Sequence, residues 1–65
     1  MTEAELKAVS PGLHALCRAL VRRTPVAAED LFQETVRRAL EGPYRPEGSL
    51  RAWLAVIARN TFLTL

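Results

Sequence analysis

The chain has 65 residues, about half of them apolar and a quarter charged, which is typical of one small globular domain rather than of a disordered segment. The single cysteine excludes an internal disulfide, and the single histidine excludes a His/Cys metal cluster. Residues 1–36 carry five acidic and four basic side chains, whereas residues 37–65 carry two acidic and five basic ones, so an anionic partner is expected at the second half.

The N-terminal segment shows no targeting signal. It carries Glu3 and Glu5 and lacks the apolar region of a signal peptide. No uncharged apolar run in the chain approaches the ~20 residues that span a bilayer. We therefore expect a cytoplasmic protein without membrane insertion, and no cofactor, metal or small-molecule substrate.

Two helices are predicted in the first part of the chain. Thr2 with Glu5 fits a capping box at the start of a short helix that ends at about Val9. Ser10-Pro11 then predicts a new start, because Ser is a favoured N-cap and Pro suits the first helical position. The helix after this start has one apolar face. That face comprises Leu13, Leu16, Cys17, Leu20 and Val21.

A third helix is predicted from about Pro25 to Glu41, since the residue before a proline is pushed out of the α region. Gly42-Pro43 ends it, and Gly42 is expected in the left-handed conformation that closes many helices. Its apolar stripe comprises Ala28, Leu31, Phe32, Thr35, Val36, Ala39 and Leu40.

The last helix is predicted from about Leu50 onwards, with Ser49 as its N-cap. One apolar arc of this helix is typical of a core position, and it comprises Leu50, Trp53, Leu54 and Ile57. Val56, Phe62 and Leu63 are apolar as well but lie outside that arc. Because a helix that is apolar all round must be covered on several sides, we expect a partner or further sequence over these three residues.

Together these elements predict an all-α fold: a single domain over residues 1–65, a small bundle of three main helices plus a short N-terminal one. No pair of residues suggests catalysis, since His14 has only Ser10 as a possible partner at helical spacing. We expect His14 at the edge of the core and Cys17 as a small buried apolar residue. The sequence therefore predicts a binding module rather than an enzyme.

Polar side chains gather on the outer side of the third helix. They are Asp30, Gln33, Glu34 and Arg37. Asp30 and Glu34 are like charges four residues apart, which mildly destabilises a helix, and a Glu34–Arg38 pair offsets this effect. Two interpretations stay open: an ordinary solvated surface, or a docking surface for a basic partner helix.

The segment between the last two helices is predicted to be a short loop stiffened by two prolines. Tyr44 and Arg45 in this loop could stack on a base or hold a phosphate. Equally, Tyr44 could cover the core and Arg45 could be a solvated loop residue.

The sequence AEDLFQETVRRAL, followed by GSLRAWLAVIARNTF, resembles domain 2 of bacterial sigma factors of the extracytoplasmic-function (ECF) type. The resemblance covers about Leu13 to Phe62 and implies that the third helix docks on the clamp helices of the RNA polymerase β′ subunit. The implied polymerase contacts are Asp30, Gln33 and Glu34, with Arg37 on the same face. Trp53 matches the family tryptophan and is expected in the core.

The same resemblance implies that the loop and the last helix recognise and melt the promoter −10 element by holding flipped bases. The predicted DNA contacts are Tyr44, Arg45, Ser49, Arg59, Asn60 and Thr61. The apolar residues outside the core arc of the last helix are predicted to contact an anti-sigma factor. They are Val56, Phe62 and Leu63.

The sequence departs from the family pattern after the last helix. Neither the family's Arg/Lys-rich helix end nor a second domain for the −35 element follows Leu65. We therefore expect an excised domain or a naturally shortened relative with weak DNA affinity, because phosphate neutralisation supplies most of that affinity. A sigma-mimicking domain that sequesters an anti-sigma factor is the main alternative, and an independent helix-turn-helix DNA binder is a third. Gln33, Glu34 and Asn60 favour the sigma-factor domain.

Overall fold

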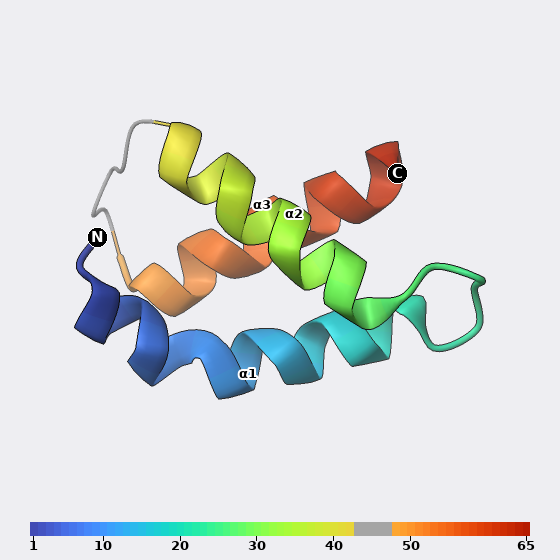
Figure 1. The fold of residues 1–65 in the computed structure, drawn as a ribbon, viewed down its shortest axis with the longest axis horizontal. Helices are drawn as coiled ribbons and strands as arrows, with labels where there is room; N and C mark the ends of the chain where they lie inside the picture. Colours follow the sequence, from blue (N-terminus) through green and yellow to red (C-terminus); the bar gives the residue numbers. More distant parts are fainter. Residues whose placement is uncertain (43–47) are drawn as a thin grey trace.

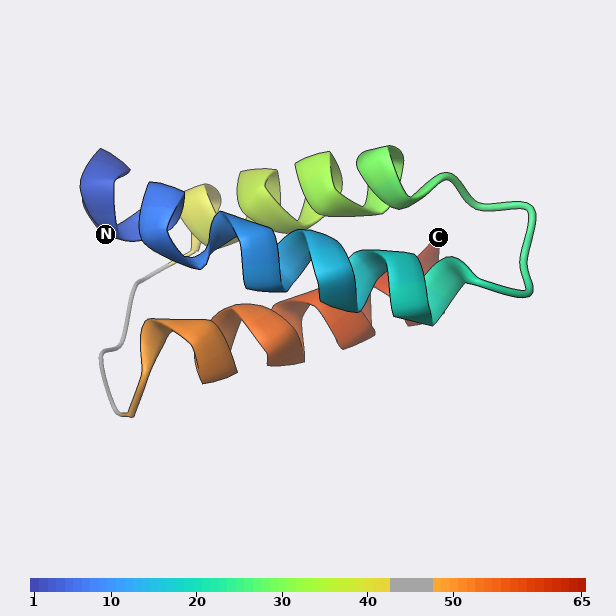
Figure 2. The same ribbon diagram turned by 90° about the horizontal axis from the view of Figure 1, so that it is seen from below.

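The computed structural model describes residues 1–42 and 48–65. Three helices form the fold: α1 (Glu3–Val21), α2 (Ala28–Glu41) and α3 (Leu50–Thr64). Each helix packs against both others (Figure 1). Figures 1 and 2 show that α1 and α3 run in the same direction and that α2 runs opposite to both. The predicted all-α fold is confirmed.

The start of α1 has the predicted capping box. The Thr2 N–H donates to Glu5 Oε1 at 2.9 Å, and the Glu5 N–H donates to Thr2 Oγ1 at 3.1 Å. These bonds satisfy two of the N–H groups that a helix start leaves unpaired. The bond from the Thr2 backbone N–H holds the pKa of the Glu5 carboxyl below its usual value.

The predicted break at Ser10-Pro11 is wrong, because α1 continues through Pro11 without interruption. Ser10 is not an N-cap: its hydroxyl donates to the Leu6 carbonyl at 2.8 Å, one turn back in the same helix. A proline inside a helix costs about 3 kcal/mol. The apolar residues before and after Pro11 lie on one continuous face that packs against the core, which offsets this cost. The short N-terminal helix is therefore the first part of α1.

The second helix begins later than predicted, at Ala28 instead of Pro25. The hydroxyl of Thr24 donates to the Val21 carbonyl at 3.0 Å and accepts from the Val26 N–H at 3.2 Å. Thr24 thus shapes the turn after α1 rather than the start of α2. Ala27 is the N-cap of α2, and no side chain caps that end, so acidic residues in the first turn are its main electrostatic support.

The two described glycines around the second connection differ from expectation. Gly42 is extended (φ −85°, ψ 161°) rather than left-handed, and its N–H donates to the Arg38 carbonyl. Gly48 has the positive φ instead, at 97°, a conformation that favours glycine. Ser49 is the N-cap of α3 as predicted, since its side chain accepts from the Ala52 N–H at 3.1 Å.

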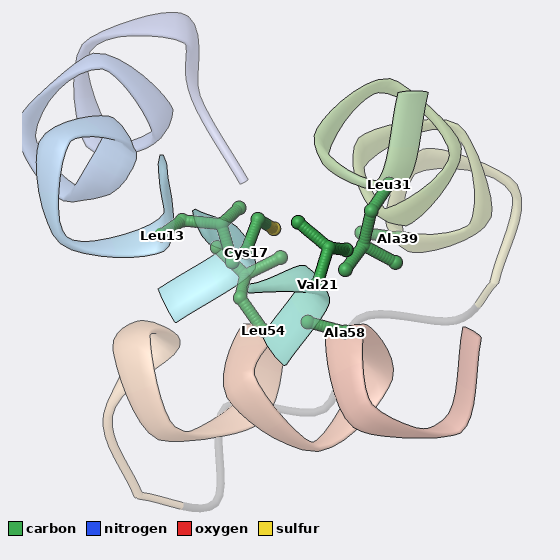
Figure 3. Packing of buried hydrophobic residues seen from close by; sticks show 7 residues of the cluster. All are labelled: Leu13, Cys17, Val21, Leu31, Ala39, Leu54 and Ala58. Atoms are coloured by element: carbon green, nitrogen blue, oxygen red, sulfur yellow. The ribbon is translucent and has the colours of Figure 1, made fainter. Parts of the chain in front are cut away.

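The core lies where the three helices meet. Figure 3 shows its buried apolar side chains: Leu13, Cys17, Val21, Leu31, Ala39, Leu54 and Ala58. The burial of Cys17 confirms the prediction for that residue and raises the pKa of its thiol. Trp53 packs against this cluster but is only partly buried, so it belongs to the edge of the core rather than to its centre.

Two predicted apolar faces differ in part from the structure. Leu40 is not part of the buried stripe of α2, because Leu31, Thr35 and Ala39 define the inward side and Leu40 stays 62% exposed. The predicted arc of α3 does face the core, since Leu54 is fully buried and Leu50, Trp53 and Ile57 pack against the core while partly buried. Ala58 and Thr61 are buried in addition. The small side chain of Ala58 allows close helix packing, and this turns the inward side of α3 towards it.

Candidate functional site

The outward side of α2, here called the α2 outer face, comprises Asp30, Gln33, Glu34 and Arg37. Asp30, Gln33 and Arg37 are exposed, because they lie opposite the buried residues of the helix. The amide of Gln33 donates from Nε2 to Glu29 Oε1 at 3.1 Å. The carboxylate of Asp30 makes no hydrogen bond or ion pair with the described residues, so this acid is available to a partner.

Glu34 is held by two arginines of its own helix. Its carboxylate accepts from Arg37 through two guanidinium nitrogens and from Arg38 Nε at 3.2 Å. Arg37 also donates to Glu41 at 2.7 Å. The bond from Arg37, more than that from Arg38, lowers the pKa of Glu34 to about 2. The predicted Glu34–Arg38 pair is confirmed. Glu34, Arg37, Arg38 and Glu41 form a network of alternating charges, and Asp30 lies outside it.

Arg38 ties this network to the end of α3. Its Nη1 donates to the Thr64 hydroxyl at 3.1 Å, across 26 positions of sequence. The Thr64 hydroxyl in turn donates within α3 to the Thr61 and Asn60 carbonyls at 3.1 and 3.3 Å. A continuous polar connection therefore joins Glu34 on α2 to the backbone of α3 at Asn60.

The outward side of α3, here called the α3 outer face, comprises Val56, Arg59, Asn60 and Leu63. All four are exposed, Val56 at 53% and Leu63 at 79%. Their spacing of three, four and seven residues places them on one side of the helix. The side chains of Arg59 and Asn60 make no hydrogen bond or ion pair with the part of the chain that the structure describes. Both polar groups are thus free to meet a partner.

Other predicted contacts are placed differently. Thr61 is fully buried, so the prediction that it touches DNA is wrong; its hydroxyl faces the core and has no partner among the described residues. Phe62 is partly buried against the core, which leaves less of it for a partner than predicted. The oxygen of Ser49 is used in the cap of α3, although its O–H can still donate. Tyr44 and Arg45 lie outside the described residues.

A second polar cluster lies between α1 and α2 and was not predicted. The ring of His14 stacks on Phe32, and its Nδ1 lies 3.9 Å from Glu29 Oε2. The spacing of Glu29 and Gln33 is a sequence signal for their hydrogen bond, since residues four apart meet on a helix. The contacts of His14 join two different helices, so no spacing in the sequence indicates them. The edge position predicted for His14 is confirmed.

The model of one protein family, Sigma-70 region 2, matches residues 6–65. The chain belongs to that family. Its members are helical domains of transcription initiation factors, which bind RNA polymerase and recognise the promoter −10 element. Neither the curated proteins nor the solved structures give a match. Among the helices formed by residues 1–42 and 48–65, none combines the length and apolar character that crossing a bilayer requires.

Proposed function

We propose that this chain acts as region 2 of an ECF-type sigma factor, with its two tasks on separate helices. The α2 outer face binds the clamp helices of the RNA polymerase β′ subunit, and the α3 outer face takes part in reading and melting the −10 element. The observation that supports this most is the exposure of Gln33 and Asn60 on different helices of one fold that matches the family over residues 6–65.

The α2 outer face suits a protein partner. Asp30 offers an uncompensated carboxylate, and Gln33 offers an amide that Glu29 already holds in place. A side chain held before binding loses less conformational freedom in the complex, which favours affinity. Glu34 and Arg37 contribute less directly, because their charges compensate each other. The charge of Asp30 is complementary to a basic helix such as the expected clamp element.

The α3 outer face suits a nucleic acid. Asn60 has two amide donors and a carbonyl acceptor, enough to recognise the edge of a base pulled out of the stack. Arg59 beside it supplies a cation for a phosphate. Ser49, the N-cap of α3, remains a proposed contact, as do Tyr44 and Arg45, which lie outside the described residues. With few arginines on this side, the chain alone should bind single-stranded −10 DNA weakly and with a shallow salt dependence.

A second candidate partner is an anti-sigma factor at Val56, Phe62 and Leu63. The exposure of Val56 and Leu63 favours it, because contiguous exposed apolar side chains often mark a protein interface. A sigma mimic would use this apolar surface and dispense with the α2 outer face. Binding of the chain to polymerase core therefore separates the two functions: a sigma domain binds core, and a mimic binds only the anti-sigma factor.

The test of the main proposal is a titration of the chain into RNA polymerase core, repeated with the variant D30A/Q33A. The variant should bind more than tenfold more weakly, a loss of about 1.4 kcal/mol or more. Both residues are exposed, so the circular dichroism spectrum and melting should not change. E3Q, which removes an exposed acid in the first turn of α1, is the matched control. Equal binding by D30A/Q33A and the parent would refute the role of the α2 outer face.

A further inference from the structure

A chain of three contacts leads from α1 to the exposed amide of Gln33. The imidazole of His14 stacks on Phe32, with ring centroids 3.6 Å apart and an interplanar angle of 11°. Its Nδ1 lies 3.9 Å from Oε2 of Glu29. The other oxygen of the same carboxylate, Oε1, accepts the hydrogen bond from Gln33 Nε2 at 3.1 Å. Each oxygen of Glu29 thus serves a different neighbour, one on α1 and one on α2.

We infer that His14 is a positioning residue for the α2 outer face: acting through Glu29, it orients the amide of Gln33 and makes polymerase binding depend on pH. This inference rests on the proposed function, because Gln33 must be a polymerase contact for its orientation to affect binding. His14 does not touch the partner itself. It lies at the α1–α2 contact, and within residues 1–42 and 48–65 only Glu29 connects it with Gln33.

The geometry gives Gln33 one defined orientation. Because Nε2 donates to Glu29, the amide cannot flip without losing that bond, and its carbonyl oxygen stays available as an acceptor. Glu29 itself is exposed, with 61% of its side chain accessible, and it would sample several rotamers without a second anchor. His14 provides that anchor, and the stack on Phe32 restrains the imidazole in turn.

The strength of this anchor depends on the charge of the imidazole. Histidine is the side chain that ordinarily gains its charge between pH 5 and 8. Glu29 of α2 faces the imidazole and attracts its charged form, whereas Arg18, four residues further along α1, lies on the same side of that helix and repels it. When His14 is charged, the 3.9 Å contact becomes an ion pair with Glu29. Polymerase binding should therefore be tighter at pH 6 than at pH 8.

A double-mutant cycle tests the connection, with a β′ clamp-helix fragment as the binding probe at pH 6. H14F keeps an aromatic ring for the stack and removes Nδ1, and it should weaken binding by about threefold, the scale of an exposed ion pair. In the Q33A background the same change should have no further effect, because His14 acts only through Gln33. E29Q should behave like H14F, and E3Q should leave binding unchanged.

A pH profile distinguishes positioning from a merely structural role. The ratio of the affinities of the parent and H14F should be about three at pH 6 and near one at pH 8. Titrating groups of the clamp fragment cancel in this ratio. Additive losses in H14F/Q33A, or a ratio that does not change with pH, would overturn the inference. If Q33A alone binds normally, Gln33 is not a polymerase contact and the inference loses its premise, whereas normal binding by D30A/Q33A refutes the proposed function.

A measurement without polymerase keeps the two failures apart. The side-chain amide resonances of Gln33 should shift between pH 6 and 8 in the parent chain, and they should not shift in H14F or E29Q. The chain contains one histidine, and a shift that disappears in H14F is assignable to it. If the Gln33 resonances of the parent do not change with pH, the coupling of His14 to Gln33 is refuted, regardless of the result with the clamp fragment.

Discussion

The outer faces of α2 and α3 differ in how their polar side chains are held. On α2, Gln33, Glu34 and Arg37 all take part in hydrogen bonds with neighbours of the same helix. On α3, the side chains of Arg59 and Asn60 have no such partner among the described residues, and exposed Val56 and Leu63 lie beside them. A face fixed in advance favours docking of a folded protein, whereas uncommitted amide and guanidinium groups can adapt to flexible single-stranded DNA.

The two faces nevertheless share one scaffold, and the largest predicted effect removes both together. Leu54 is fully buried at the junction of the three helices (Figure 3). L54A should cost about 2–5 kcal/mol, which is most of the stability of a domain this small. Urea unfolding followed by circular dichroism measures the loss. W53A should cost less, because Trp53 is partly exposed. A stable L54A that lost only one face would show that the faces fold independently.

The next effect compares the two buried threonines, one beneath each face. The hydroxyl of Thr35 on α2 donates to the Leu31 carbonyl at 2.7 Å, whereas that of Thr61 on α3 has no partner among the described residues. Removing a hydrogen-bonded hydroxyl should lower the free energy of unfolding, whereas removing a buried hydroxyl without a partner should raise it. T35V should lower the free energy of unfolding by about 1 kcal/mol, and T61V should raise it by a similar amount.

Chemical denaturation of both variants measures these differences, and −10 DNA binding provides the control. Because Thr61 faces the core, T61V should bind DNA as the parent does. A T61V variant that is less stable than the parent would reveal a hydrogen bond for this hydroxyl. If T61V has an altered base preference, Thr61 does contact DNA.

The smallest predicted effect is a loss of stability in acid. Of the two outer faces, only that of α2 should contribute to this loss. Bonds from Arg37 and Arg38 lower the pKa of Glu34 to about 2, from an ordinary value of 4.5. A lowered pKa in the folded state stabilises the fold above pH 4.5, and this contribution disappears as the pH falls from 4.5 to about 2. No acidic residue lies between Leu50 and Leu65.

Thermal unfolding of the parent and E34Q between pH 5 and 2 measures this contribution. The difference in melting temperature between them should shrink as the pH falls through this window. Glu5, whose pKa is also lowered, is unchanged in both proteins and cancels. A difference that stays constant down to pH 2 would mean that the ion pairs of Glu34 do not support the fold.

Much of the fold is predictable from local sequence signals. The caps at Thr2 and Ser49 place the starts of α1 and α3 correctly, whereas α2 begins three residues later than predicted. The error at Ser10-Pro11 arises because packing of one long apolar face outweighs a local proline signal. The prediction for Gly42 failed for another reason: a glycine permits the left-handed conformation but does not require it.

The candidate site is predictable where it depends on one helix and not where helices meet. The exposure of Asp30, Gln33 and Asn60 follows from helical spacing alone. Helical spacing also predicts the depth of Thr61, because it lies four residues after Ile57 and seven after Leu54, on the side of the apolar arc. The contact of His14 with Glu29 depends on the pairing of α1 with α2 and is not encoded in a local pattern.

If the two faces have separate partners, a substitution on either face should affect only one of them, and a reciprocal binding measurement distinguishes the two cases. Each of D30A/Q33A and N60A is measured against a β′ clamp-helix fragment and against a panel of single-stranded −10 oligonucleotides with one base varied at a time. D30A/Q33A should lose clamp binding and keep the base preference of the parent. N60A should keep clamp binding and lose the preference at one position. If either variant changes both partners, or if N60A retains the full base preference, the division of function between α2 and α3 is wrong.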